Sequence, residues 1–299
     1  MAKAFPPDVL LLDYQSAIFA RLERGKTNPL LTNVRSYSVP VETFQAGAIG
    51  PSPGDPELLT GLAQRIRREQ GRLDQLSVLL PDSWFRLILI EPASMPDRKG
   101  EADEMVRWTL KRILPVRPED FRMAWQVVGK TENGVRVIVA AALEKTLVAI
   151  EEAFRSVGTE VILVESTGLN IWNSIAAREE AGARERVFFY LRGGDFTTAV
   201  FRGDEPLFVR SRNIGAERSL LQEIRLSASY FSSALKMESI DRCYLAGEGF
   251  TADLASAIGE QLHAPTSKIA LADFADYSNA VDVRGMEAEL AACTGVFTA

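Results

Sequence analysis

Residues 187–211 read VFFYLRGGDFTTAVFRGDEPLFVRS, and this stretch decides the fold. Its apolar, β-forming runs are separated by two glycine-containing turns, and the runs span residues 187–191, 196–201 and 207–209. Short strands bounded by glycine and aspartate are typical of β-hairpins. The stretch therefore predicts three neighbouring strands joined by tight turns.

The first of these turns also has the residue types of a phosphate-binding loop. It carries Gly193 and Gly194, followed closely by Thr197 and Thr198. Glycine lets backbone N–H groups approach a phosphate, and threonine hydroxyls add further donors. An ordinary surface hairpin has the same glycines, and short glycine motifs match many unrelated proteins. The turn by itself leaves both interpretations open.

The composition is that of a folded protein with more than one structural unit. The chain has 299 residues, of which 46% are hydrophobic and 25% charged, so about two domains or one large domain with lobes are expected. The formal net charge is −6. Because proteins that bind nucleic acids are usually basic, we expect no nucleic-acid partner.

The few cysteine and histidine residues and the short apolar runs limit which cellular compartment and which kinds of site are expected. The two cysteines, Cys243 and Cys293, are too far apart in the sequence to suggest a metal site, and they suit a reducing compartment. His263 is the only histidine, which argues against a histidine-rich metal site. The first residues lack a secretion signal, and the longest apolar run, 137–143, is too short to span a bilayer. We expect a cytoplasmic protein without a metal, with no direct membrane insertion.

Strands and helices alternate along the whole chain. Strands are expected at 9–14, 17–22, 33–41, 75–80, 84–90, 121–128, 135–143, 161–164 and 242–245, besides the three of the opening stretch. Helices are expected from Asp55-Pro56 onward and at 101–114, 144–156, 167–180, 220–235, 251–262 and 286–296. This order indicates the α/β class.

The order of elements also predicts an internal duplication. A β-meander followed by a helix begins near Val9 and again near Val187. We expect a first lobe at residues 1–180, containing an inserted β-β-α-β-β-α module at about 75–158. The second lobe would span 181–299 and be reduced in size.

Several segments together resemble the PilM family of type IV pilus assembly. The resemblance rests on residues 56–70, 76–96, 101–129, 135–166, 219–250 and 285–299, in this order and spacing. It extends to the cytoplasmic domain of type II secretion L proteins and to FtsA. The fold that it implies is the actin-like fold, with duplicated β-β-β-α-β-α lobes and ATP between them.

The resemblance implies where a nucleotide site would lie in this chain. Its residues would come from three loops, namely Asp13 and Ser16 in the first, Gly193, Gly194, Thr197 and Thr198 in the second, and Gly247 and Gly249 in the third.

The residues depart from the family's pattern at these loops. Tyr14-Gln15 replaces a glycine, and Leu191 stands where the family has an acidic residue that orders water or Mg²⁺. Glu248 brings a carboxylate near the anion, which costs roughly 1 to 4 kcal/mol at partly exposed separations. We therefore expect a vestigial site without hydrolysis and no required cofactor, although weak binding of ATP and Mg²⁺ is compatible with these residues.

The resemblance also implies partners. It predicts a PilN-like single-pass inner-membrane protein, whose cytoplasmic peptide would bind beside the inserted module, and an assembly motor ATPase as a further partner. Trp108, Arg112 and Pro115 are the candidate contacts for the peptide. The alternative for Trp108 is plain core packing. The chain would then be a cytoplasmic scaffold recruited to the inner face of the membrane.

Two other functions remain open at this point. An active ATPase or small-molecule kinase of the same fold would use Asp13, Gly193, Thr197 and Thr198 as its phosphate site, but Leu191 argues against it, because catalysis needs an acid or base within hydrogen-bond reach. A filament-forming protein of the actin-like kind is the third alternative.

Overall fold

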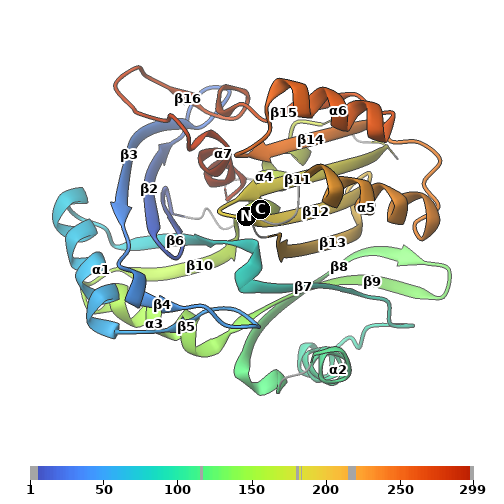
Figure 1. The fold of residues 1–299 in the computed structure, drawn as a ribbon. Helices are drawn as coiled ribbons and strands as arrows, with labels where there is room; N and C mark the ends of the chain where they lie inside the picture. Colours follow the sequence, from blue (N-terminus) through green and yellow to red (C-terminus); the bar gives the residue numbers. More distant parts are fainter. Residues whose placement is uncertain (1–5, 115–116, 180–181, 183, 215–219, 297–299) are drawn as a thin grey trace.

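The computed structural model describes residues 6–114, 117–179, 182, 184–214 and 220–296. Two large β-sheets stand side by side, and a smaller sheet lies below them in the view of Figure 1. Helices α4 (Thr167–Ala176) and α7 (Glu287–Gly295) lie at the centre of the molecule, between the two large sheets.

The first large sheet has six strands. In spatial order they are β10 (Glu160–Ser166), β6 (Gln75–Leu80), β1 (Asp8–Leu12), β2 (Ser16–Glu23), β3 (Leu30–Ser38) and β16 (Asp276–Tyr277). Strands β1, β2 and β3 are antiparallel neighbours, whereas β6 runs parallel to both β1 and β10. Helices α1 (Pro56–Gln70) and α3 (Glu144–Arg155) pack on one of its faces through an apolar cluster.

The second large sheet repeats this arrangement. Its strands are, in spatial order, β13 (Glu205–Asn213), β12 (Asp195–Arg202), β11 (Glu185–Arg192), β14 (Arg242–Gly247) and β15 (Thr266–Lys268). Again three neighbouring strands, β11, β12 and β13, are antiparallel, whereas β14 runs parallel to β11 and β15 runs parallel to β14. Helices α5 (Leu220–Ser233) and α6 (Ala252–Leu262) pack on one face. The duplication and the three-stranded meander predicted from the sequence are confirmed.

The start of α1 shows how the sequence fixes a helix end. The Asp55 side chain accepts a hydrogen bond of 2.9 Å from the Glu57 backbone N–H, and Pro56 occupies the first helical position. Both features stabilise the first turn, where backbone N–H groups have no partner inside the helix. The helix therefore begins where the sequence predicted.

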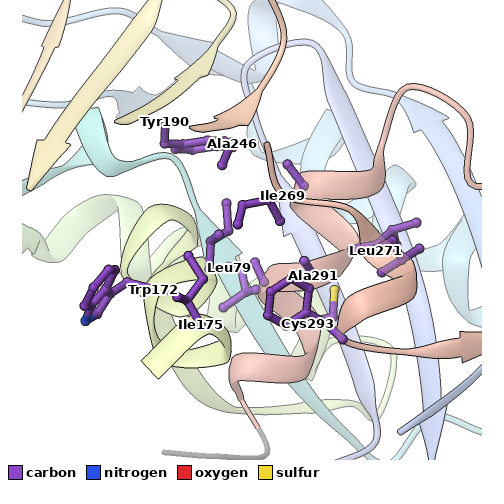
Figure 2. Packing of buried hydrophobic residues seen from close by; sticks show 14 of the residues in the cluster. Leu79, Trp172, Ile175, Tyr190, Ala246, Ile269, Leu271, Ala291 and Cys293 are labelled. Atoms are coloured by element: carbon purple, nitrogen blue, oxygen red, sulfur yellow. The ribbon is translucent and has the colours of Figure 1, made fainter. Parts of the chain in front are cut away.

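Helices α4 and α7 are in close contact because small residues line their interface. The Ser174 hydroxyl lies 2.8 Å from both the Ala291 carbonyl oxygen and the Thr294 hydroxyl. A Cβ atom on Gly295 would lie 2.1 Å from the Asn170 carbonyl oxygen, so only glycine allows this approach. The core around the two helices joins side chains from both large sheets, as Figure 2 shows.

The third sheet forms a separate unit with its own helix. Its strands are β7 (Phe85–Ile90), β9 (Gly134–Leu143) and β8 (Phe121–Thr131), all antiparallel, and α2 (Lys99–Ile113) covers one face. Strand β6 and helix α3, which the sequence placed within the inserted module, instead belong to the first large sheet and its helix layer. The three-stranded unit thus spans residues 85–143, while the lobe boundary near residue 180 stays a prediction.

The apolar face of α2 follows a four-residue spacing. Val106 and Leu110 are buried, and Leu114 packs against the same cluster, whereas Ile113 is 51% exposed. Residues four positions apart lie on one face of a helix, so Leu114 rather than Ile113 continues the buried stripe.

Candidate functional site

A buried carboxylate joins the two large sheets. Asp82, in a short turn (Asp82–Trp84) after β6, accepts hydrogen bonds from the Ser166 hydroxyl at 2.5 Å, the Gly168 N–H at 2.7 Å and the Thr197 hydroxyl at 2.6 Å. Ser166 and Gly168 belong to the start of α4, whereas Thr197 lies on β12. Burial raises the pKa of Asp82, and the three donors oppose that shift.

Only a small cavity remains between the sheets at this point. Its volume is about 30 Å³, and Asp13, Ser16, Asp82 and Thr197 are among its lining residues. A water molecule needs about 10–15 Å³ by this kind of measure, whereas small-molecule sites usually have about 300–1,000 Å³. Asp13 and Ser16 of the first loop and Thr197 of the second loop therefore line one cavity, which has room for water but not for a nucleotide.

Asp13 faces this cavity from the end of β1. It accepts a hydrogen bond of 2.6 Å from the Tyr14 backbone N–H. Burial raises the pKa of Asp13, Asp195 and Glu248 act in the same direction, and Arg192 opposes them. The surroundings of Asp13 are therefore rich in negative charge, which disfavours a further anion.

The turn between β11 and β12 has the backbone conformation that the sequence suggested. Gly193 and Gly194 have φ values of +55° and +84°, which favour glycine. The Gly193 N–H donates a hydrogen bond to the Glu248 carboxylate, so a side chain of the protein accepts from this turn. Thr198, the neighbour of Thr197, is buried with its hydroxyl unpaired among the described residues.

The third glycine turn contacts the same hairpin. Gly247 has a φ of +91°, and a Cβ atom there would lie 2.0 Å from the Leu191 carbonyl oxygen. Gly249 also has a positive φ, +79°. These glycines are explained by the close approach of the two turns, and Glu248 between them supplies the carboxylate that Gly193 contacts.

A second buried carboxylate lies on α7. Glu289 is 4% exposed and lies 3.1 Å from the Arg192 guanidinium and 3.3 Å from the Tyr190 hydroxyl. Burial raises the pKa of Glu289, and Arg192 opposes that shift. Arg192, the cation beside the hairpin that was expected to bind phosphate, is therefore paired with a carboxylate of the protein itself.

Sequence reasoning missed Asp82 and Glu289. One signal for Asp82 was available, because it follows Pro81 directly after the buried strand β6. Polar residues at the carboxyl ends of parallel strands often lie at ligand sites of α/β folds. For Glu289 the neighbouring residues are small and apolar, and nothing in the pattern sets it apart.

Two of the candidate partner contacts, Trp108 and Arg112, lie on the outer side of α2. Trp108 is 60% exposed, and the Arg112 guanidinium lies over its ring at 5.0 Å from the centroid. The core-packing alternative for Trp108 is therefore wrong. Pro115 lies outside the described residues.

A groove of about 500 Å³ lies beside the three-stranded sheet. Its lining combines β7, β8 and β9 with β10, α4 and the edge of the second large sheet, through residues that include Phe85, Ala124, Ile138, Leu163, Trp172 and Pro206. Ala124 and Ile138 point to this side, whereas Val137 and Val139 face α2. The groove and the Trp108 surface are thus on opposite faces of the same sheet.

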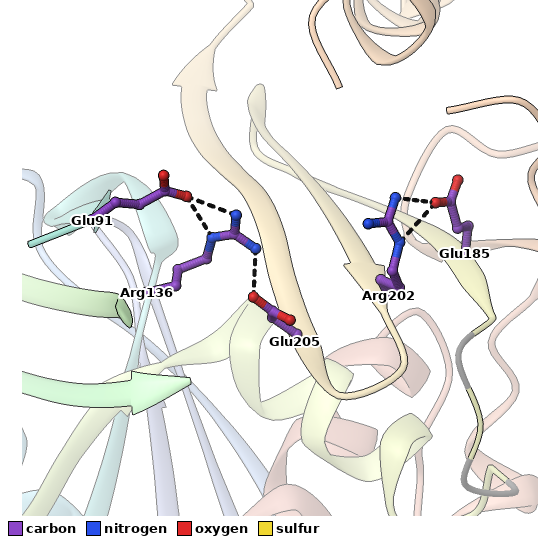
Figure 3. Close-up of polar contacts among 5 residues, drawn as sticks. All are labelled: Glu91, Arg136, Glu185, Arg202 and Glu205. Atoms are coloured by element: carbon purple, nitrogen blue, oxygen red, sulfur yellow. Dashed lines mark hydrogen bonds and ion pairs between the residues drawn. The ribbon is translucent and has the colours of Figure 1, made fainter. Parts of the chain in front are cut away.

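An ion-pair cluster connects the small sheet to the second large sheet. Arg136 of β9 lies 2.7 Å from Glu91 and 2.6 Å from Glu205 of β13, as Figure 3 shows. Nearby, Arg202 pairs with Glu185 within the second large sheet. A Cβ atom on Gly129 of β8 would lie 2.1 Å from the Glu205 carboxylate, so the two sheets approach closely here.

Among the described residues, no helix is both long and apolar enough to cross a bilayer. No group of three or more His, Cys, Asp or Glu side chains among the same residues is arranged to hold a metal ion.

Comparisons with known proteins identify the fold. No family model matches the chain, and no characterised protein matches its sequence. A chain of the PilM–PilN type IV pilus biogenesis complex is 20% identical, with a TM-score of 0.75 and 96% of each chain covered. The cytoplasmic domain of EpsL, an inner-membrane component of the Vibrio cholerae type II secretion system, is 13% identical with a TM-score of 0.52, covering 98% of this chain and 94% of that one.

A third similar structure is described as having an actin-like ATPase fold. It is a Bacteroides thetaiotaomicron protein of unknown function with an actin-like ATPase fold, 12% identical with a TM-score of 0.53, covering 96% of this chain and 95% of that one. Together with the duplicated sheets, these similarities show that the chain has the actin-like fold found in the PilM–PilN complex.

Proposed function

We propose that this chain is a scaffold of a type IV pilus or type II secretion-like assembly platform, and that it binds the cytoplasmic peptide of a single-pass inner-membrane partner. The observation that carries the proposal is the difference in volume between two cavities. The cleft between the large sheets holds about 30 Å³, whereas the groove beside the small sheet holds about 500 Å³. The fold shared with the PilM–PilN complex supports the same assignment.

The cleft does not fit a nucleotide. Thr197, which would contact a phosphate, donates instead to Asp82, and the Gly193 N–H donates to Glu248. Asp13, Asp82 and Asp195 stand close together there, and Arg192 is paired with Glu289. A phosphate would have to displace carboxylates from their donors and then remain next to them, which is unfavourable. In this proposal the site is vestigial, and the protein is not an ATPase or a kinase.

The groove fits an extended peptide. Its apolar lining can take aliphatic side chains, and β10 ends the order of its sheet, with β6 as its one neighbour among the described strands. A peptide strand can add to such an edge through backbone hydrogen bonds, while pockets for alternate side chains give specificity. Recruitment by the peptide would hold the protein at the cytoplasmic face of the membrane.

Trp108 and Arg112 remain candidate partner contacts in a different place. They lie on the outer face of α2, away from the groove, so they would meet another part of the partner or an assembly motor ATPase. Exposed aromatic and arginine side chains are common at the centres of protein interfaces.

The test is a binding experiment with a synthetic peptide that has the sequence of the cytoplasmic segment of a PilN-like single-pass inner-membrane protein from the same organism. Ala124 is exposed in the groove, so Ala124→Trp should fill the groove and abolish binding. Val127→Trp lies on the same strand but does not line the groove, and it should bind like the wild type. Equal binding by all three proteins would overturn the proposal.

A further inference from the structure

The groove beside the small sheet is acidic as well as apolar. Two carboxylates, Glu165 and Asp204, are among the side chains that line it, and no lysine, arginine or histidine of the described residues does so. Asp204 is largely exposed and lies 3.9 Å from Arg186. Glu165, in contrast, has no lysine or arginine within ion-pair distance among the described residues.

Glu165 lies at the end of β10, where the groove meets α4. It is half-buried, and one of its carboxylate oxygens accepts a hydrogen bond of 2.8 Å from the Asn170 side-chain amide. No lysine or arginine of the described residues forms an ion pair with it. Desolvation disfavours an isolated carboxylate, so a cation brought by a ligand would be stabilised here.

Asn170 supplies a second hydrogen-bond acceptor next to Glu165 that lacks a donor among the described residues. It is 1% exposed and lines the groove, and its side-chain oxygen has no hydrogen-bond partner among the described residues. A buried acceptor without a donor is unfavourable, because it has lost its hydrogen bonds to water. A ligand that brings several N–H donors to this position would satisfy Glu165 and Asn170 together.

We propose that Glu165 and Asn170 form a subsite for a cationic side chain, arginine in particular, of the peptide that occupies the groove. A guanidinium carries five N–H donors in one plane and no acceptor, which matches a carboxylate next to an amide oxygen. The inference rests on the proposed function, since it requires that a peptide binds in the groove. It adds the chemistry by which that peptide is recognised.

The proposed partner would naturally present such residues. Cytoplasmic segments next to a membrane span carry an excess of lysine and arginine. An apolar groove with an unneutralised carboxylate therefore selects a segment that has aliphatic side chains and a basic residue. An acidic or neutral segment would leave Glu165 and Asn170 unpaired.

The experiment compares two peptides on three proteins by isothermal titration calorimetry. The peptides are the cytoplasmic segment named above and the same segment with its arginines replaced by citrulline and its lysines by glutamine. The proteins are the wild type, Glu165→Gln, and Glu160→Gln, an exposed control on the same strand. Thermal unfolding checks that each variant is folded.

We expect Glu165→Gln to weaken binding of the basic peptide at least tenfold and to leave binding of the neutral peptide unchanged. Glu160→Gln should behave as the wild type. If Glu165→Gln changes nothing while Ala124→Trp still abolishes binding, the subsite is wrong and the groove proposal stands. If Ala124→Trp also has no effect, the groove proposal fails and the subsite fails with it.

Discussion

The Thr197 hydroxyl donates a hydrogen bond of 2.6 Å to the Asp82 carboxylate, which ties the meander of the second large sheet to the turn after β6 in the first. In the actin-like arrangement, this is where the two lobes would enclose a ligand. Here the contact is made within the protein, and Ser166 and Gly168 complete the coordination of the carboxylate. Groups of the protein itself therefore link the two large sheets at this point.

A substitution at Gly168 tests how rigidly the Asp82 carboxylate is held. A Cβ atom at Gly168 would lie 2.0 Å from an Asp82 carboxylate oxygen, whereas nothing lies within 4 Å of a Cβ atom at Gly61 in α1. Glycine to alanine in a helix normally stabilises by about 0.5–1 kcal/mol. We expect this gain for Gly61→Ala and a loss of about 2–4 kcal/mol for Gly168→Ala, because a buried hydrogen-bond network is broken. Urea unfolding measures both, and a gain for Gly168→Ala would show that Asp82 is loosely placed.

Arg136 tests the attachment of the small sheet to the second large sheet. Its side chain is 17% exposed and that of Glu205 is 27% exposed. A double-mutant cycle with Arg136→Ala and Glu205→Ala should give a coupling free energy of about 1 kcal/mol in urea unfolding, since the pair is partly shielded from water. Arg72→Ala with Asp74→Ala, a far more exposed pair, serves as the control and should show weaker coupling. Equal coupling in both pairs would mean that Arg136 does not fasten the sheets.

Trp108 tests the outer surface of α2. Because it is 60% exposed, Trp108→Ala should lower stability by no more than about 0.5–1 kcal/mol, the range of an exposed cation–π contact with Arg112. We expect weaker retention of the full-length membrane partner in a pull-down, with little change in peptide affinity at the groove. Unchanged retention would remove Trp108 from the partner surface.

The pH dependence of peptide binding tests the state of Glu165. Burial raises the pKa of Glu165 above its ordinary value, and Asn170 opposes that shift. Below this raised pKa the carboxylate is protonated and no longer attracts a cation, so affinity for the basic peptide should fall as the pH is lowered, and the fall should begin at a higher pH than for an ordinary glutamate. The other ionisable side chain that lines the groove within the described residues is Asp204, so Asp204→Asn serves as a control that keeps the dependence. A flat profile for the wild type, like that expected for Glu165→Gln, would contradict the subsite.

Local patterns predicted most of the fold. The glycine turns of 187–211 and the cap at Asp55 encode their structures within a few residues, and both were confirmed. The assignment of β6 to the inserted module was wrong, because a buried apolar strand has the same appearance in either sheet. Pattern also could not show that Trp108 is exposed, since helix α2 is amphipathic with a wide apolar face.

The candidate site was predicted only in part, because its decisive contacts are between distant residues. Asp13, Ser16 and Thr197 line one small cavity, while their assignment to a nucleotide site stays a prediction. The sequence could not reveal that Asp82, 115 positions before Thr197, accepts the threonine hydroxyl. Such pairing depends on how two sheets, built from different parts of the chain, pack against each other.

The central claim is that the protein closes its interlobe cleft with its own carboxylates and works as a scaffold. Calorimetric titration with Mg·ATP, followed by a phosphate-release assay on the same sample, tests it most directly. We expect no binding in the micromolar range and no phosphate release, because Thr197 stays paired to Asp82. Micromolar binding of Mg·ATP together with phosphate release would contradict it and favour an active ATPase.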